Sequence, residues 1–204
     1  MQEEYYFYEP KLGHGLKHDP INAIVGPRAI GWIGTKSSSG TLNLAPYSFF
    51  NLFNYRPPII AFSSLGYKDS LRNVMETGVF TWNLVSRDLA EQMNLSSIEQ
   101  AVPEFEFAGL TPLDARNVDA PRVGESLVSF ECRLTQHLRL QDINETELDT
   151  WMVFGEVIGV HIAPSCLVEG VYNTSHAQPV LRGGGAGDYF TITEAAKFVL
   201  RRPK

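Results

Sequence analysis

Apolar and polar residues alternate over several short runs of this chain, with the two-residue period that side chains have along a β-strand. In VFTWNLV, the residues Phe80, Trp82 and Leu84 fall on one face, and Asn83 is the polar exception on the other. In the run 128–135, apolar and polar residues alternate between an expected core face and an expected wet face. The pattern predicts strands at 29–35, 41–44, 59–63, 79–85, 128–135 and 151–162.

Only two segments have the spacing of an amphipathic helix. In KDSLRNVMETG the apolar residues recur at helical intervals, and Gly78 is a natural stop at the C-terminal end. The second segment is SRDLAEQMNLSS, with Ser86 as the expected N-cap and an end near Ser96. Six or more strands beside two helices predict an antiparallel barrel rather than a parallel sheet of βαβ units.

The connections between these elements are read from glycine, proline and polar residues. KSSSG predicts a hairpin turn, and Pro57 and Pro58 are expected at a turn or a strand edge, because proline cannot donate to a sheet ladder. Gly155 and Gly159 mark positions where a barrel strand bends or another backbone approaches closely. Residues 1–20 are expected to form an irregular N-terminal arm, residues 102–124 irregular connections with short strand pieces, and residues 164–204 a loop-rich segment.

Composition narrows the functional classes. The 204 residues carry a formal net charge of -6, which argues against binding to a nucleic-acid backbone, and we expect a single compact domain. We see neither a membrane-spanning run nor a secretory signal, which predicts a cytoplasmic protein. Cys132 and Cys166 are expected to be reduced and structural, and the glycines around His14 and His18 disfavour a metal site there.

The segment 43–70 holds the candidate chemistry. Its second half, SSLGYKDS, places hydroxyls and Lys68 before a predicted helix, whose N-terminal N–H groups and dipole can hold a phosphate. Its first half, NLAPYSFF, combines a proline-led turn, Ser48 and aromatic surface, which suits a planar ring. Ordinary helix capping and a plain turn before a core strand explain the same residues without any ligand.

The combination resembles the flavin-reductase-like, FMN-binding split-barrel family. The resemblance rests on PRAIGWIGT, NLAPYSFFN, PPIIAFSS followed by KDSLRNVMETG, and VFTWNLVS, and it covers roughly residues 20 to 190 in order. It implies a mainly β, Greek-key split barrel with a few peripheral helices, forming a homodimer that holds FMN near the subunit interface. Ala29 stands where the family commonly has the second proline of Pro-Arg-Pro.

The resemblance also implies which residues meet the cofactor. The ring and ribityl parts of FMN would lie against Thr35, Ala45, Pro46, Tyr47, Ser48, Phe49 and Asn83. The phosphate would be held by Ser63, Ser64, Lys68 and Ser70. Arg28 reaches the cofactor or the dimer interface, or is a solvated arginine.

A flavoprotein of this kind needs orientation of a nicotinamide rather than a protein nucleophile, so no catalytic triad is expected. His161 positions a nicotinamide or protonates reduced flavin, unless it is a hydrogen-bonded structural histidine. The glycine-rich segment 182–189 is either a flexible loop or a flap whose Arg182 or Tyr189 meets the substrate.

Two functions follow. The first is an NADH- or NADPH-dependent flavin reductase, which passes reduced flavin to a monooxygenase or electrons to another acceptor. The second is an FMN-binding redox or storage protein without efficient nicotinamide turnover.

Overall fold

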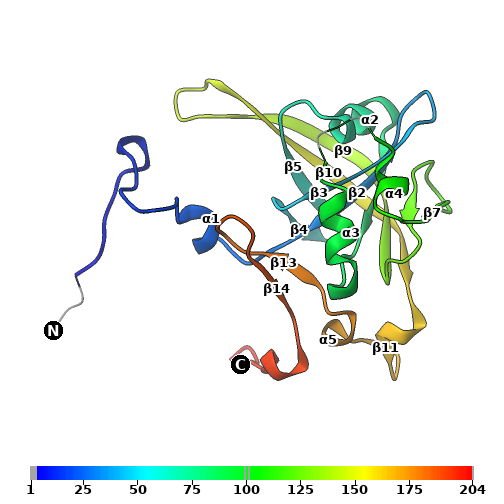
Figure 1. The fold of residues 1–204 in the computed structure, drawn as a ribbon. Helices are drawn as coiled ribbons and strands as arrows, with labels where there is room; N and C mark the ends of the chain where they lie inside the picture. The colour runs from blue at the N-terminus through cyan, green and yellow to red at the C-terminus, as the bar shows by residue number, and fades with distance from the viewer. Residues whose placement is uncertain (1–3, 99, 101, 204) are drawn as a thin grey trace.

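Seven antiparallel strands form the main sheet of the computed structural model, which describes residues 4–98, 100 and 102–203. The strand that begins this sheet leads through Ser48 and Phe49 into the strand at its opposite edge, and α2 (Asp69–Thr77) lies over one end (Figure 1). The mainly β split barrel that the sequence predicts is therefore confirmed. The strands, in spatial order, are β3 (Leu42–Tyr47), β2 (Gly31–Lys36), β6 (Val79–Asn83), β9 (Val128–Gln141), β10 (Glu147–Ile162), β5 (Pro58–Leu65) and β4 (Phe50–Tyr55).

Short elements surround the barrel. A small sheet joins β1 (Arg28–Ala29), β13 (Val180–Arg182) and β14 (Tyr189–Thr191), and two-stranded ladders join β7 (Pro112–Leu113) to β8 (Arg122–Val123) and β11 (Leu167–Val168) to β12 (Val171–Tyr172). The other α-helices are α1 (Ile21–Ile24), α3 (Ala90–Leu95), α4 (Glu104–Phe107) and α5 (Thr174–Ala177). Single 3-10 turns occur at Pro10–Leu12, Arg87–Leu89, Pro164–Cys166 and Glu194–Ala196.

Three apolar cores explain why these elements pack together, and the two larger ones involve the barrel and its helices. Inside the barrel, Leu71 and Val74 from α2 meet Phe62 and Phe80 from the strands, and all four are fully buried. Burying each such side chain contributes about 1.5–3 kcal/mol. A second core lies outside β2 and β3, where α3 and α4 cover Trp32 and neighbouring apolar residues. The predicted helix 69–77 thus closes the barrel because its apolar stripe faces inward.

The predicted strands are present, and three expectations need correction. The wet face expected on 128–135 is wrong for Ser129 and Glu131, which are buried because residues 116–123 pack over them. Ser86 precedes the 3-10 turn but makes no capping hydrogen bond with its side chain. Helix α4 lies in the 102–124 segment that was expected to be irregular.

Two glycines permit close packing in the barrel wall. A Cβ added at Gly155 would lie 2.4 Å from ring atoms of Phe80, and β9 and β10 shift register beside it. A Cβ added at Gly34 would lie 2.3 Å from the carbonyl oxygen of Pro121. The predicted bend at Gly155 is confirmed, although an aromatic ring, not another backbone, fills the space there.

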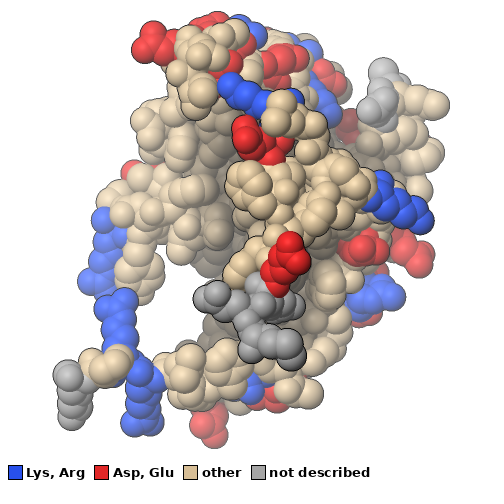
Figure 2. Space-filling model, turned by 90° about the vertical axis from the view of Figure 1, so that its left-hand side faces the viewer, with Lys and Arg blue, Asp and Glu red and all other residues tan. Residues whose placement is uncertain are grey.

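The N-terminal arm and C-terminal tail extend away from the barrel (Figure 1). On the face shown in Figure 2, basic and acidic side chains are interspersed around a broad uncharged area. Cys132 and Cys166 are both buried free thiols, as predicted. Within the described ranges, no helix has the length and apolarity required to cross a bilayer.

Candidate functional site

The N-terminus of α2 presents backbone N–H groups without protein acceptors. Lys68 precedes the helix in an extended conformation and makes no capping hydrogen bond with its side chain. The N–H groups of Asp69, Ser70 and Leu71 have no acceptor in the described part of the chain. The Asp69 carboxylate opposes an anion here, but it lies 2.8 Å from the guanidinium of Arg72, which offsets its charge. The helix dipole and Lys68 therefore suit an anionic group.

A buried amide network lies beneath this helix terminus. The Asn43 side-chain amide donates to Ser70 Oγ at 2.8 Å and to Thr35 Oγ1 at 3.3 Å. The Asn73 amide donates to the same Thr35 oxygen at 3.0 Å. Ser70 is 1% exposed and Thr35 is fully buried, so these side chains fix α2 against β2 and β3.

Two buried polar atoms beside this network remain without partners. The Tyr47 hydroxyl and the Asn73 Oδ1 atom make no hydrogen bond of normal geometry to the described residues. Burial raises the pKa of the Tyr47 phenol, and the nearby Ser70 and Ser64 hydroxyls offset part of that rise. Buried polar atoms are rarely left unpaired, so this end of the barrel has unused hydrogen-bonding capacity.

The predicted phosphate residues are not all on one surface. Ser64 is buried, donates to the Gly66 carbonyl at 2.8 Å and lies near the Tyr47 hydroxyl. Ser63 is its neighbour in β5, so its side chain points to the opposite face. Ser64, Lys68 and Ser70 therefore gather around the start of α2, and Ser63 lies behind them.

Asn83 is a structural junction. Its Oδ1 accepts from the Val123 N–H at 2.9 Å and from the Ser129 hydroxyl at 2.8 Å, and its amide donates to the Trp32 carbonyl and the Thr81 hydroxyl, each at 3.2 Å. The side chain is fully buried, and it ties β6 to β2, β8 and β9. It therefore fastens the outer face of the barrel wall to the segment that covers it.

A cleft of about 180 Å³ brings together segments far apart in the sequence. Pro46 and Ser48, from the segment assigned to the flavin ring, face Arg182 and Tyr189, from the segment assigned to the substrate. Helix α3 and the residues after it form another wall. The remaining lining residues are Ile30, Met93, Asn94 and Ser97.

Arg182 orders the glycine-rich segment at this cleft. Its guanidinium donates to the carbonyls of Gly184, Gly185 and Asp188 at 3.2, 3.1 and 2.8 Å. It also lies 4.9 Å from the ring centre of Tyr189. The segment is therefore held by the arginine next to the cleft.

Arg28 performs a similar task for the N-terminal arm, and of the three alternatives left open for it, the structure contradicts the solvated arginine. It is half-buried and donates to the carbonyls of Asn22, Val25, Ser48 and Gly183. Its guanidinium also lies 5.2 Å from the ring centre of Phe49. Arg28 thus joins the arm, the β3–β4 bend and the glycine-rich segment.

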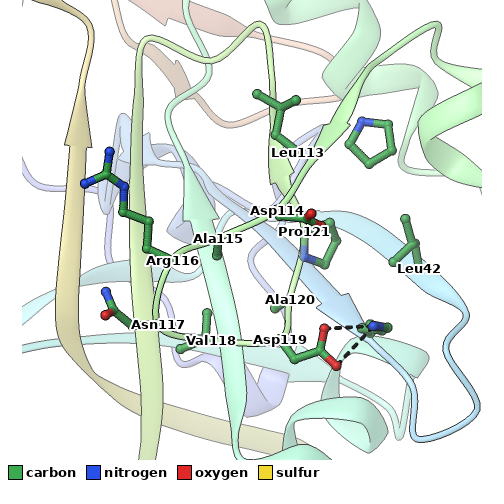
Figure 3. Close-up of a pocket in the computed structure, with 12 residues that line it drawn as sticks. Leu42, Leu113, Asp114, Ala115, Arg116, Asn117, Val118, Asp119, Ala120 and Pro121 are labelled. Atoms are coloured by element: carbon green, nitrogen blue, oxygen red, sulfur yellow. Dashed lines mark hydrogen bonds and ion pairs between the residues drawn. The ribbon is translucent and has the colours of Figure 1, made fainter.

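A larger hollow of about 560 Å³ lies elsewhere, inside the loop 112–121 (Figure 3). Lys36 of β2 also lines it and pairs with Asp119 at 2.7 Å. No sequence pattern predicted this hollow, and it is lined mainly by the loop itself.

His161 contacts a buried carboxylate. Its Nε2 lies 2.5 Å from Glu131 Oε1, and Glu131 also accepts the backbone N–H groups of Arg116 and Asn117 at 2.8 and 2.6 Å. Neither hollow includes His161 among its lining residues. This geometry favours the structural alternative for His161. Across the described residues, no His, Cys, Asp or Glu cluster is suited to a metal ion.

Sequence reasoning missed several residues that build the site. Asn43 and Asn73 were available as polar residues at buried positions of a strand and a helix that otherwise carry apolar side chains. The contribution of Met93, Asn94 and Ser97 depends on α3 lying beside β3, which no local pattern reveals.

The chain is similar to several known proteins. The family model described as flavin reductase like domain matches residues 26–180. An uncharacterised protein of Aquifex aeolicus is 38% identical over 173 residues, which cover 81% of this chain and 85% of that protein. Two solved structures are also similar.

The first is nitrilotriacetate monooxygenase component B from Bacillus cereus, with a TM-score of 0.79 and 26% identity over 88% of this chain and 91% of that one. The second is the 2-nitrobenzoate 2-nitroreductase NbaA of Pseudomonas fluorescens, with a TM-score of 0.78 and 28% identity over 90% and 91% of the two chains. Because the family model covers most of the sequence, this chain belongs to the flavin reductase-like domain family.

Proposed function

We propose that this protein is an FMN-binding oxidoreductase that transfers hydride from NADH or NADPH to flavin. The main support for this proposal is the course of the segment 43–70. It runs from the residues at the cleft that are assigned to the flavin ring to the unpaired N–H groups at the start of α2. Such a segment suits a ligand with a planar end and an anionic end. Family membership and the redox enzymes named among the similar structures support the same class of activity.

In this proposal, Lys68 and the first N–H groups of α2 hold the FMN phosphate. Ser64 and Ser70 shape the site from the barrel side, whereas Ser63, which the family resemblance also assigns to the phosphate, lies on the opposite face of β5. The unpaired Tyr47 hydroxyl fits a polar ligand or an ordered water at this position. Residues around Ala45, Pro46, Ser48 and Phe49 contact the ring and ribityl parts, and Thr35 and Asn83 hold the strands that carry them.

Bound flavin supplies the two-electron chemistry, so the chain's task is to bind and orient. Arg182 and Tyr189 are the proposed substrate-binding residues, because both line the cleft beside Pro46 and Ser48. His161 contacts Glu131 and not the cleft, so it has a structural role in this proposal.

A second candidate function is an FMN-binding redox or storage protein without efficient NAD(P)H turnover. One observation favours it: the cleft volume of about 180 Å³ is below the range of about 300–1,000 Å³ usual for small-molecule sites. A whole dinucleotide would have to extend beyond the cleft.

Steady-state oxidation of NADH and NADPH, with and without added FMN, separates these functions. The reductase proposal predicts flavin-dependent oxidation of at least one nucleotide, and Tyr189→Ala should raise KM about tenfold through lost ring packing. Phe198→Ala, in the exposed tail, is the matched aromatic control and should leave KM unchanged. Flavin binding without oxidation of either nucleotide would favour the carrier function instead.

We also propose a cytoplasmic homodimer that serves a monooxygenase or another electron acceptor. The edge strand β4 exposes Leu52, Phe53 and Tyr55 at 51%, 58% and 72%, which is the kind of apolar edge that a partner chain covers. Light scattering should give twice the chain mass for the native protein and a monomer for Phe53→Asp with Tyr55→Asp. A native monomer would contradict the dimer.

A further inference from the structure

Two arginines lie directly opposite each other in the small sheet beside the cleft. Arg28 of β1 pairs with Arg182 of β13 in the antiparallel register, and both guanidinium groups reach the glycine-rich segment. Like charges placed opposite each other in a ladder repel, unless a neighbouring group compensates them. The two guanidinium groups therefore need neighbouring groups that compensate their charges.

Backbone carbonyls compensate part of this positive charge. Arg28 has four carbonyl acceptors and Arg182 has three, but neither forms an ion pair with a carboxylate in residues 4–98, 100 and 102–203. Asp188 lies in the same segment, yet Arg182 binds its backbone carbonyl rather than its side chain. The two positive charges therefore remain without a neutralising anion.

Arg182 also retains hydrogen-bonding capacity. A guanidinium has five N–H donors, and the three recorded bonds of Arg182 come from its two terminal nitrogens, so its Nε–H and one further N–H have no acceptor in the described residues. The Tyr189 ring lies against this group, with its centre 4.9 Å from the guanidinium carbon. A planar, pre-positioned guanidinium is well suited to a phosphate oxyanion.

The adjacent cleft indicates which ligand carries that oxyanion. Its walls combine apolar Met93 and Pro46 with the hydroxyls of Ser48 and Ser97 and the Asn94 amide. The wall formed by Met93, Asn94 and Ser97 suits one heteroaromatic ring with an amide substituent beside the flavin ring at Pro46 and Ser48, and the volume of about 180 Å³ excludes the rest of a dinucleotide. The phosphates of such a ligand must lie outside the cleft, where Arg182 lines the cleft and Arg28 reaches the same glycine-rich segment.

We infer that Arg28 and Arg182 form a subsite for the phosphates of the nicotinamide dinucleotide whose ring enters the cleft. This inference rests on the proposed function. It assigns to the arginine pair the recognition of the donor's phosphates and leaves the FMN phosphate at α2. Arg28 also holds Ser48, so the pair couples donor binding to the bend that contacts the flavin ring.

The test compares three electron donors on the FMN-loaded protein: NADH, NADPH and the phosphate-free 1-benzyl-1,4-dihydronicotinamide. Arg182→Gln and Arg28→Gln should each raise KM for NADH and NADPH about tenfold or more, with KM for the phosphate-free donor unchanged. Arg182→Lys should recover part of the loss, because charge remains while the planar geometry does not. Arg139→Gln is the matched control, since Arg139 also stacks on an aromatic ring, that of Trp151.

Three results would overturn the inference. An equal rise in KM for all three donors would mean that the arginines only hold the loops. An unchanged KM for NADH and NADPH would remove the subsite. A weaker FMN affinity with unchanged KM would assign the arginines to the flavin phosphate.

A second measurement separates this inference from the proposed function. Inorganic pyrophosphate is titrated calorimetrically into FMN-saturated wild type and into the Arg28→Gln, Arg182→Gln double variant. Saturable binding that the double variant loses supports the subsite even if no donor is oxidised. No binding to wild type overturns it, whether or not the protein is a reductase.

Discussion

Replacing Glu131 with glutamine will lower the free energy of unfolding by about 3 kcal/mol at pH 7. The Glu131 side chain is fully buried and accepts two successive backbone N–H groups and the His161 ring. A glutamine has the same shape, but its amide NH₂ would face one of those donors. One donor would then be buried without an acceptor, and the loop that Glu131 fastens would loosen.

The pH dependence of stability gives an independent reading of the same group. Burial alone would raise the pKa of Glu131, but the hydrogen bonds from the Arg116 N–H, the His161 ring and Asn117 outweigh it and lower the pKa from 4.5 to about 2. Because the folded pKa is depressed, this stabilisation is fully present above pH 4.5 and is lost as the pH falls towards 2. The difference between the two values corresponds to about 3 kcal/mol.

Urea unfolding at a fixed protein concentration, from pH 3 to 7, measures both effects. Wild type should lose stability steeply below pH 4.5, and Glu131→Gln should show a shallower fall from a lower starting point. Glu147→Gln is the control: its ion pair with Arg139 is exposed, so it should cost about 0–1 kcal/mol. Equal effects of the two substitutions would show that the buried carboxylate does not hold the loop.

Local sequence patterns were sufficient to predict most strands of the barrel and the helix α2. The helical spacing in 69–77 depends on a single environment, because one face of the helix meets the interior, and the apolar run 79–85 marks a strand that is buried on both faces. The burial of Glu131 could not be predicted from such local patterns. The alternation in β9 predicts that this position faces solvent. The position is buried only because the loop 114–121 packs against β9 in the folded chain.

The candidate site likewise has one part that could be predicted from the sequence and one part that could not. The start of α2 was predictable, since a helix terminus follows from local spacing and Lys68 precedes it in the sequence. The cleft was not, because it joins β3, the end of α3 and the glycine-rich segment, which are brought together only by tertiary packing. The roles of Arg28 and Asn43 likewise depend on partners 20 or more residues away.

Removing the charge of Lys68 and the hydroxyl of Ser70 will weaken FMN binding about a hundredfold. Lys68→Ala deletes a charged donor at the helix terminus, which is worth about tenfold or more in affinity. Ser70→Ala acts from beneath, because it removes the acceptor for the Asn43 amide and loosens the start of α2. The two effects should combine, since one is a direct contact and the other sets its position.

Matched controls separate a phosphate site from general damage. Lys11→Ala removes an exposed lysine in the N-terminal arm and should leave FMN affinity unchanged. Riboflavin, which lacks the phosphate, should bind wild type and Lys68→Ala with similar affinity. A parallel loss for riboflavin and FMN would indicate a disturbed fold rather than a lost phosphate contact.

The most direct test of the account is a calorimetric titration of FMN into the flavin-free wild-type protein and the Lys68→Ala, Ser70→Ala variant. We expect saturable FMN binding by wild type and an affinity about a hundredfold lower for the double variant. Absence of FMN binding by wild type, or equal affinity of the two proteins, would contradict the assignment of segment 43–70 to the flavin.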